Sequence, residues 1–269
     1  MNRITILGSG TSTGVPILGC PCPVCKSTDP RNQRLRTSAI IELSSKKRIL
    51  IDASPDLRTQ LLRAKIDNVH GVIITHDHAD HTHGMDDLRP FGFKSEIPLP
   101  VYCNEETAET LRSKFPYIFE RSKVFANKPV LGGGIPLLDL HPITSDAFQI
   151  LGETFHGYPL PHGHSLTMGL QHGKMAYLTD CREIPENQLK QLAEAKLELL
   201  LIDCLRYHPH STHLHLERTL EYVKIISPRQ AVLIHMGHEI DYLELMERLR
   251  MQSMKNILPA IDGMSFLYS

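Results

Sequence analysis

The stretch Val72 to Gly84 reads VIITHDHADHTHG, with four histidines and two aspartates directly behind an apolar run. The run GVIIT (71–75) has the length and β-branched composition of a strand buried between layers. Ionisable side chains behind such a strand are costly unless a partner balances their charge. Imidazole and carboxylate groups are ligands of zinc, manganese and iron, and a loop at a strand end can direct several towards one point. The stretch therefore predicts a metal site.

The spacing within the motif suits two ions. His76 and His78, two residues apart, can bind one ion, while Asp80 and His81 turn towards a second. The alternative is a solvated polar loop in which the histidines are incidental. The unbroken strand that leads into the loop favours the metal site.

Length and composition limit the class of protein. The chain has 269 residues, 41% hydrophobic and 22% charged, as in ordinary globular proteins. No run approaches the roughly 18 apolar residues of a membrane span. The first residues, MNRITILGSG, lack the apolar core of a signal peptide, so we expect a cytoplasmic protein that does not bind membranes. A net charge of −1 argues against a nucleic-acid polymer as partner, because such proteins need a basic face.

The chain reads as alternating strands and helices. Apolar runs bounded by turn residues predict strands at 3–7, 38–43, 48–52, 71–75, 99–103, 174–179, 197–203 and 230–235. Helical spacing or capping predicts helices at 55–65, 104–115, 185–196, 213–226 and 241–251. Residues 116–136, rich in proline and glycine, are predicted to form an excursion loop rather than a domain boundary. We expect residues 1–269 to form one layered α/β domain.

A second candidate metal site lies in GCPCPVCK (19–26). Cys20, Cys22 and Cys25 offer three thiolates and imply a fourth ligand elsewhere. We predict a structural zinc, because the loop is too rich in proline to be held by secondary structure; three free thiols are the alternative. Cys103 and Cys204 lie in apolar segments and are predicted to be buried thiols.

The histidine motif resembles that of the metallo-β-lactamase superfamily of metal-dependent hydrolases, and the resemblance covers essentially the whole chain. It implies a four-layer αββα sandwich with further site residues after later strands. Asp52 would support the site, Asp180 would bridge two metals and His235 would be the last ligand. His164 matches the third histidine, with His162 as second choice because the following SLTMG fits His164 better. The implied ligand sets are His76, His78 and His164 for one ion and Asp80, His81 and His235 for the other, with Asp180 spanning both.

Two divalent cations at such a site, zinc, manganese or iron, have a defined chemistry. They lower the pKa of a bridging water, which gives hydroxide at neutral pH. They also neutralise charge that grows on a phosphoryl or carbonyl oxygen. Ligand histidines must be neutral, so metal affinity is expected to fall in acid.

The cysteine loop narrows the resemblance to the phosphoribosyl cyclic phosphodiesterase of phosphonate breakdown and its relatives. In that branch a histidine just beyond the last active-site histidine completes the zinc site, which implies His238. A histidine on a later loop touches substrate, which implies His213 as general acid, with His215 as a less favoured substitute and a water-facing histidine at a helix start as the alternative. Asp80 is expected to share in catalysis. Arg89 could bind substrate phosphate or pair with an aspartate.

Two other segments are predicted to carry no chemistry of their own. GTSTG (10–14) fits the nucleophile-elbow pattern, but no helix follows it. We expect a tight loop beside the metals whose N–H groups can meet an anion. Arg31, Arg34 and Arg36 are predicted to lie on a solvated surface.

The resemblance implies a metal-dependent phosphodiesterase acting on a small cyclic or nucleotide-like phosphodiester, such as phosphoribosyl cyclic phosphate. The alternatives are a thiolester hydrolase and a cofactor-biosynthesis protein of the pyrroloquinoline quinone type, which carries a related cysteine loop. A transfer-RNA processing nuclease would need a basic arm, which the near-neutral charge disfavours. The complete two-metal ligand set favours phosphodiester hydrolysis. If the chain self-associates, a homodimer is the commonest assembly.

Overall fold

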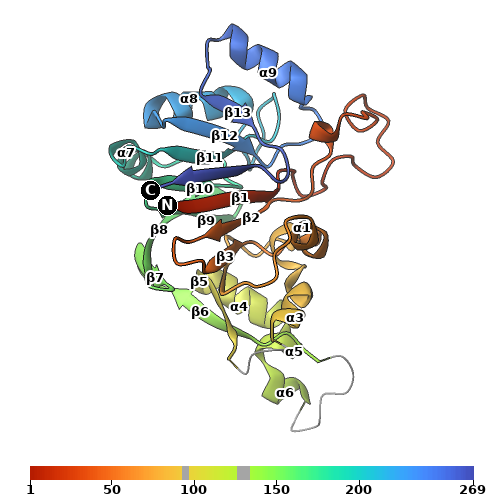
Figure 1. The fold of residues 1–269 in the computed structure, drawn as a ribbon, viewed down its shortest axis with the longest axis vertical. Coiled ribbons are helices and arrows are strands. Elements are labelled where there is room, and N and C mark those ends of the chain that lie inside the picture. The colour runs from red at the N-terminus through yellow and green to blue at the C-terminus, as the bar shows by residue number, and fades with distance from the viewer. Residues whose placement is uncertain (93–96, 126–133) are drawn as a thin grey trace.

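The computed structural model describes residues 1–92, 97–125 and 134–269, and two seven-stranded mixed sheets form its centre (Figure 1). The first sheet runs, in spatial order, through β14 (Ser265–Tyr268), β1 (Asn2–Gly8), β2 (Ser38–Glu42), β3 (Arg48–Ile51), β4 (Gly71–Ile73), β5 (Leu99–Asn104) and β6 (Leu138–Ile143). The second runs through β13 (Ile257–Pro259), β12 (Gln230–Ile234), β11 (Leu199–Asp203), β10 (Met175–Leu178), β9 (Ser165–His172), β8 (Glu153–His162) and β7 (Ala147–Ile150).

The two sheets pack face to face through alternating apolar residues. On β1, Ile4 and Ile6 belong to the buried cluster between the sheets, which they share with Leu170 of β9. The neighbouring Leu7 belongs instead to a cluster on the outer face of the first sheet. Because successive side chains of a strand point to opposite faces, this division shows that helices must cover the outside as well.

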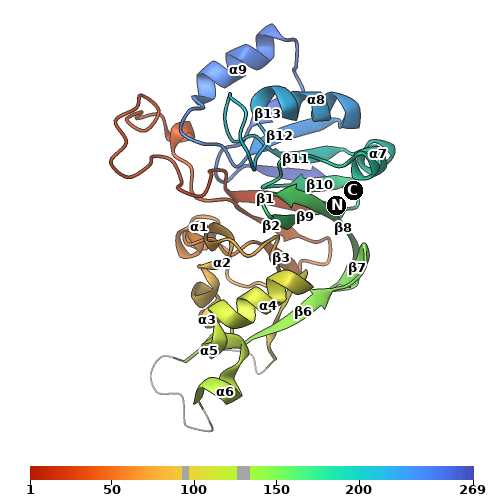
Figure 2. The same ribbon diagram turned by 180° about the vertical axis from the view of Figure 1, so that it is seen from behind.

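Helices cover both outer faces (Figures 1 and 2). On the first sheet lie α1 (Leu57–Arg63), α4 (Glu105–Lys114) and α5 (Pro116–Phe119), and on the second lie α7 (Glu186–Glu194) and α8 (Leu216–Ile226). The predicted four-layer αββα sandwich is confirmed. The remaining elements are η1 (Pro30–Asn32), α2 (Ala79–Thr82), η2 (Met85–Leu88), α3 (Arg89–Gly92), α6 (Arg121–Phe125) and α9 (Tyr242–Met251). Within the described ranges, no helix has the length and apolarity to cross a membrane.

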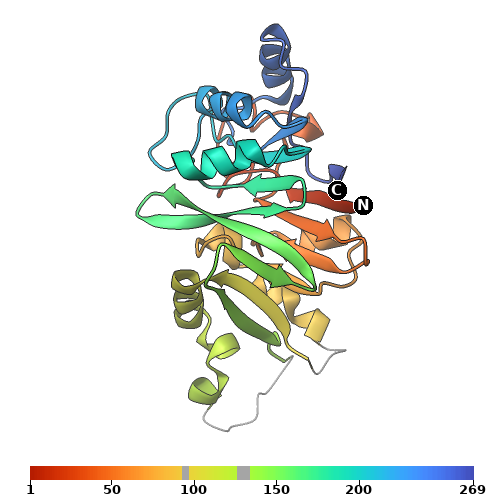
Figure 3. The same ribbon diagram turned by 90° about the vertical axis from the view of Figure 1, so that its left-hand side faces the viewer.

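The predicted strands and helices are all present, with ends shifted by a few residues. The predicted excursion loop at 116–136 is wrong in its first part, where α5 and α6 form; residues 126–133 lie outside the described residues. The sequence prediction missed β6 to β9 as well as β13 and β14. The long β8–β9 hairpin (green in Figure 3) matters most, because His162 ends its first strand.

Arg34 is buried and does not lie on the predicted solvated surface. Its guanidinium donates to Gly237 O at 3.2 Å, to Ile240 O at 2.8 Å and to Asn32 Oδ1 at 3.2 Å. Burial lowers its pKa to about 10. Arg34 therefore ties the loop after β12 to the segment before β2, which a solvated arginine would not do.

We expect Arg34→Ala to lower the free energy of unfolding by about 3 kcal/mol, because it leaves two buried carbonyls without a donor. Arg36→Ala serves as control, since Arg36 is 30% exposed and lies 3.8 Å from Asp56. It should cost less than about 1 kcal/mol. Urea unfolding measures both. Equal losses in the two variants would contradict this role for Arg34.

Candidate metal centre

Strand ends from both sheets meet at one edge of the sandwich and carry ionisable side chains. Asp52 follows β3, Asp180 follows β10 and His235 follows β12. All three have left-handed backbones, with φ of 62°, 52° and 57°. Such a conformation is uncommon outside glycine, and it turns the chain sharply at the strand end. The three side chains are buried, at 0% to 2% exposure.

The histidine motif folds against the loop that follows β3. Ala53 N donates to His81 O, and Gly84 N donates to Ala53 O, both at 2.8 Å. A Cβ atom at Gly84 would lie 1.9 Å from Ser54 O, so only glycine allows this approach. The packing of these two loops places His81 beside Asp52.

One donor group combines His76, His78 and His162, whose ring nitrogens lie within 4.8 Å of one another. His162 Nε2 is 3.2 Å from His78 Nδ1. The Thr212 carbonyl accepts from His162 Nδ1 at 3.0 Å, which leaves the Nε2 lone pair free. The choice of His164 is wrong: the structure brings His162, the second choice, to this group. His164 lies in the exposed two-residue turn that connects the paired residues His162 and Ser165.

The other donor group combines Asp80, His81, Asp180 and His235. His81 Nε2 lies 3.2 Å from Asp80 Oδ2 and 3.3 Å from Asp180 Oδ2. His235 Nε2 lies 3.1 Å from Asp180 Oδ1. Asp180 also lies within 4.8 Å of His162, so its carboxylate stands between the two groups.

The donor atoms fit divalent cations. In the described part of the chain, Nε2 of His76, Nε2 of His81 and both ring nitrogens of His235 are buried and make no hydrogen bond of acceptable geometry, although carboxylate oxygens lie 3.1 to 3.3 Å from the Nε2 atoms of His81 and His235. Buried nitrogens are rarely left in this state, and a metal ion would occupy them. His81 Nδ1 donates to Asp52 Oδ2 at 2.7 Å, which directs Nε2 into the group.

The pKa shifts of the donor histidines agree with the binding of divalent cations. Burial lowers the pKa of His76 well below its usual value, with His81 as a further cause, so His76 is a neutral ligand. Burial alone would also lower the pKa of His81, but the carboxylates of Asp180, Asp52 and Asp80 outweigh it and raise that pKa well above normal. The site thus attracts positive charge, which cations would supply.

Asp203, at the end of β11, is a site residue that the sequence prediction missed. Its Oδ2 accepts from His213 Nδ1 at 3.0 Å and from Cys181 N at 3.2 Å. Its Oδ1 lies 3.6 Å from His235 Nδ1. The signal was available, because the run LELLLID ends in aspartate just as RILID ends in Asp52.

His213 lies beside the donor groups, near His162 and Asp180. Its ring stacks on that of His235, with centroids 4.8 Å apart. Burial alone would lower the pKa of His213, but Asp203 outweighs burial and the pKa rises to about 9. His215 instead precedes α8, with Nε2 at 3.9 Å from a Glu217 carboxylate oxygen.

A pocket of about 630 Å³ opens over both donor groups and is lined by His78, Asp80, His162, Asp180 and His213. Ser12 of the loop at 10–14 also lines it, in agreement with the predicted place of that loop. Arg89 does not line the pocket in the described part of the chain, and its Nη1 lies 3.4 Å from Gly134 O. The structure therefore does not support Arg89 as a substrate ligand.

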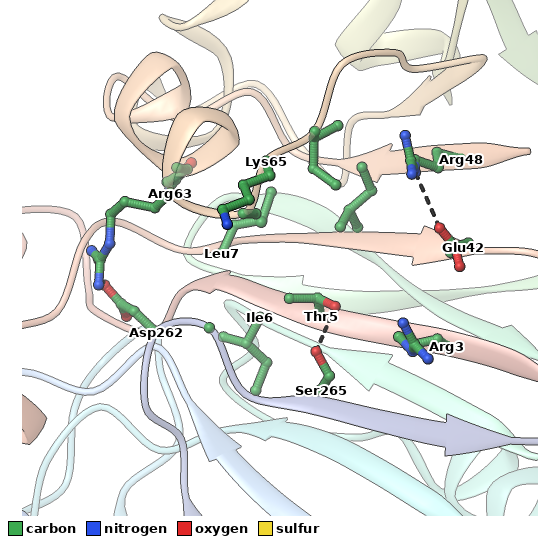
Figure 4. A pocket seen from close by; sticks show the side chains of 15 residues that line it. Arg3, Thr5, Ile6, Leu7, Glu42, Arg48, Arg63, Lys65, Asp262 and Ser265 are labelled. Atoms are coloured by element: carbon green, nitrogen blue, oxygen red, sulfur yellow. Dashed lines mark hydrogen bonds and ion pairs between the residues drawn. The ribbon is translucent and has the colours of Figure 1, made fainter.

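Another cavity, of about 510 Å³, lies on the outer face of the first sheet beside α1 (Figure 4). Its charges are largely paired: Arg48 Nε is 3.2 Å from Glu42, and Arg63 is 3.6 Å from Asp262. No histidine or cysteine lines it among the described residues. The metal-binding chemistry therefore lies in the pocket over the histidines.

The cysteine loop forms a separate four-donor group. His238 Nδ1 lies 3.3 Å from Cys20 Sγ, 3.5 Å from Cys22 Sγ and 3.7 Å from Cys25 Sγ. A hydrogen bond from Cys25 N lowers the pKa of the Cys22 thiol to about 6, whereas burial raises that of Cys25 to about 11. Three sulfurs and one nitrogen suit a tetrahedral structural zinc. Cys103 and Cys204 are buried, as predicted.

Comparisons with known proteins agree with this geometry. Residues 47–236 match the family described as the beta-lactamase superfamily domain. The chain belongs to the metallo-β-lactamase superfamily. A solved structure described as a new diphosphatase from the PhnP family has a TM-score of 0.89 and 33% identity, covering 100% of this chain and 98% of that one. The superfamily implies divalent metal ions, for which the two donor groups and the cysteine group are candidate sites.

Two other kinds of superfamily relative are informative. An octanoyltransferase of Porphyromonas gingivalis is 38% identical over 238 residues, which are 88% of this chain but 46% of that protein. This chain thus spans about half of that relative. Coenzyme PQQ synthesis protein B of Rhodopseudomonas palustris is 29% identical over an alignment of 228 residues. This alignment covers 74% of this chain and 72% of that protein. Zinc-bound PqqB of Methylobacterium extorquens shares the fold, with a TM-score of 0.77 at 18% identity.

Metal analysis can test whether His162 rather than His164 belongs to the donor group. We expect His162→Ala to lose roughly one active-site metal equivalent, because it removes one of three imidazoles from a donor group. His164→Ala, in the same turn but exposed, should keep the metal content of the natural protein. Metal analysis after dialysis against metal-free buffer compares the two. Loss of metal from His164→Ala alone would contradict the assignment.

Proposed function

We propose that this protein is a dinuclear metal-dependent phosphodiesterase that hydrolyses a small cyclic or nucleotide-like phosphodiester. The observation that carries the proposal is the position of Asp180 between two histidine-rich donor groups at the base of one pocket. Two-metal sites of this kind are typical of enzymes that cleave phosphate esters.

The side chains have distinct roles in this proposal. His76, His78 and His162 would hold one ion, Asp80, His81 and His235 would hold the other, and Asp180 lies where it could serve both. The chemistry supplied by bound ions would be an activated water and compensation of the negative charge of the phosphoryl group. Asp203 fixes His213 through Nδ1, which leaves Nε2 to hold a proton for the departing alcohol oxygen.

The substrate class rests on the pocket and on a relative. A pocket of about 630 Å³ suits a nucleotide-sized molecule rather than a polymer. The PhnP-family structure is described as a diphosphatase, so its chemistry also takes place at phosphorus. Phosphoribosyl cyclic phosphate is one example of the proposed class, and we propose no nucleic-acid or membrane partner.

A thiolester hydrolase is the second candidate. It rests on the 38% identity to an octanoyltransferase, of which this chain matches 46% and whose name describes transfer of an acyl group. The same metal ions would offset charge on a carbonyl oxygen. The likeness to coenzyme PQQ synthesis protein B keeps a role in cofactor synthesis as a further alternative.

The first experiment measures bound metals and hydrolysis of an aryl phosphodiester with and without added manganese. We expect about two active-site metals beside one zinc, and metal-dependent turnover that Asp180→Ala and Asp180→Asn abolish. Circular dichroism shows whether these variants fold. Two active-site metals without phosphodiester turnover, combined with hydrolysis of an acyl thiolester, would favour the second candidate.

A second variant tests the role of Asp203. We expect Asp203→Asn to lower kcat by about 10- to 100-fold, because His213 loses the carboxylate that orients it. The loss should be larger for an alkyl ester than for a p-nitrophenyl ester, whose leaving group needs little protonation. Asp139→Asn, at a 63% exposed side chain, is the control. An equal loss on both esters would rule out a part in leaving-group protonation.

A further inference from the structure

The pocket over the metal centre has an unusual charge distribution for a site that accepts phosphate esters. Beyond the donor groups and His213 it is lined by Ser12, Asp77, Glu106, Gly163, His164, Ser165 and Thr212, and no lysine or arginine lines it among the described residues. Lysine and arginine are the side chains that proteins commonly use to bind phosphate groups. Positive charge would therefore be concentrated at bound metal ions and at the imidazoles, which include His164 on the wall, and the other lining side chains are neutral or acidic.

The two acidic residues of this wall differ in their surroundings. Asp77 is balanced, because Lys114 Nζ lies 2.7 Å from its Oδ2 and donates to its carbonyl at 2.6 Å. Glu106 is exposed in the first turn of α4, and within the described residues its carboxylate has neither an ion pair nor a hydrogen bond. The structure leaves Glu106 as the unbalanced acid of the pocket.

The helix itself does not need Glu106. Asn104 caps α4 by accepting from Thr107 N at 2.7 Å, and Glu105 supplies another acidic side chain in the same turn. Glu105 does not line the pocket. The two neighbouring glutamates thus share charge, exposure and helix position but differ in access to the substrate.

We propose, on the basis of the function proposed above, that Glu106 selects the part of the substrate beyond the scissile phosphoryl group. A carboxylate accepts hydrogen bonds from sugar hydroxyls, as the acidic residue of dinucleotide-binding folds does from ribose. It repels a second phosphate that lies within the screening distance of about 8 Å. The preferred substrate is then a phosphodiester whose remainder is an uncharged sugar or polyol. A phosphoribosyl cyclic phosphate carries a phosphate outside the ester and should react more slowly than its dephosphorylated counterpart.

The test compares two substrates that differ by one phosphate: a nucleoside 2′,3′-cyclic phosphate and the same compound with a 5′-phosphate. The readout is the ratio of their kcat/KM values in the metal-loaded protein. We expect the natural protein to prefer the compound with the free 5′-hydroxyl. Glu106→Gln should reduce this preference by about three- to tenfold, because it removes one like-charge repulsion. Glu105→Gln should keep the ratio within about twofold, because that charge lies outside the pocket.

Each other outcome overturns a specific statement. An unchanged ratio in Glu106→Gln, or an equal change in Glu105→Gln, overturns the assignment of Glu106. Turnover of an aryl phosphodiester by the natural protein without turnover of either nucleoside compound also overturns this assignment alone. If the metal-loaded natural protein hydrolyses no phosphodiester, the proposed function fails and the assignment of Glu106 falls with it.

Discussion

The structure depends on the burial of four carboxylates, those of Asp52, Asp80, Asp180 and Asp203, at one edge of a sandwich of apolar sheets. An isolated buried carboxylate is costly, and four close together would repel one another. The histidine nitrogens around them offset this charge only in part. Two divalent cations would bring four positive charges, which equal the charge of the four carboxylates. The fold thus accepts a locally unfavourable cluster that metal binding makes favourable, as expected where metal affinity contributes to folding.

The backbone around the cluster shows what this arrangement requires. Left-handed conformations at Asp52, Asp180 and His235 turn the chain directly at the strand ends, so the side chains stay where the strands place them. The approach of Gly84 to Ser54 O draws the motif helix α2 against the loop after β3. Strain and close contact occur here because rigid strands position ligands more accurately than long loops do.

Local pattern predicted many of the strands and helices around the site and the donors of the histidine motif, whereas Asp180 and His235 were implied by the resemblance to the superfamily. The buried strands before Asp52, His76, Asp180 and His235 are largely apolar runs, which can be identified from their own sequence alone. The β8–β9 hairpin was missed because Pro159 and Pro161 argue against a strand. Only residues 153–156 of β8 pair with β7. Pro159 and Pro161 are tolerated because they lie beyond this paired part of the strand. The position of His162 depended on this hairpin, since its register alone decides which histidine faces inward and which lies in the turn.

Other features depended on contacts between distant segments, which no local pattern contains. Arg34 looks like a surface residue in sequence, and only the approach of the loop at 237–240 buries it. That loop also carries His238, three residues after the candidate ligand His235. Met236 lies between them, and its N–H donates to Ser9 O at 2.9 Å while its carbonyl accepts from Thr11 N at 3.2 Å.

The backbone that positions His235 is consequently held on both sides. Ser9 and Thr11, in the loop after β1, hold it through Met236, and the cysteine loop holds its far end through His238. A loop of this length has no regular structure to keep a ligand in place, so its order must come from such tertiary contacts. The four-donor cysteine group therefore has a physical reason to lie next to the metal centre: it anchors the short segment that presents His235 to the ion.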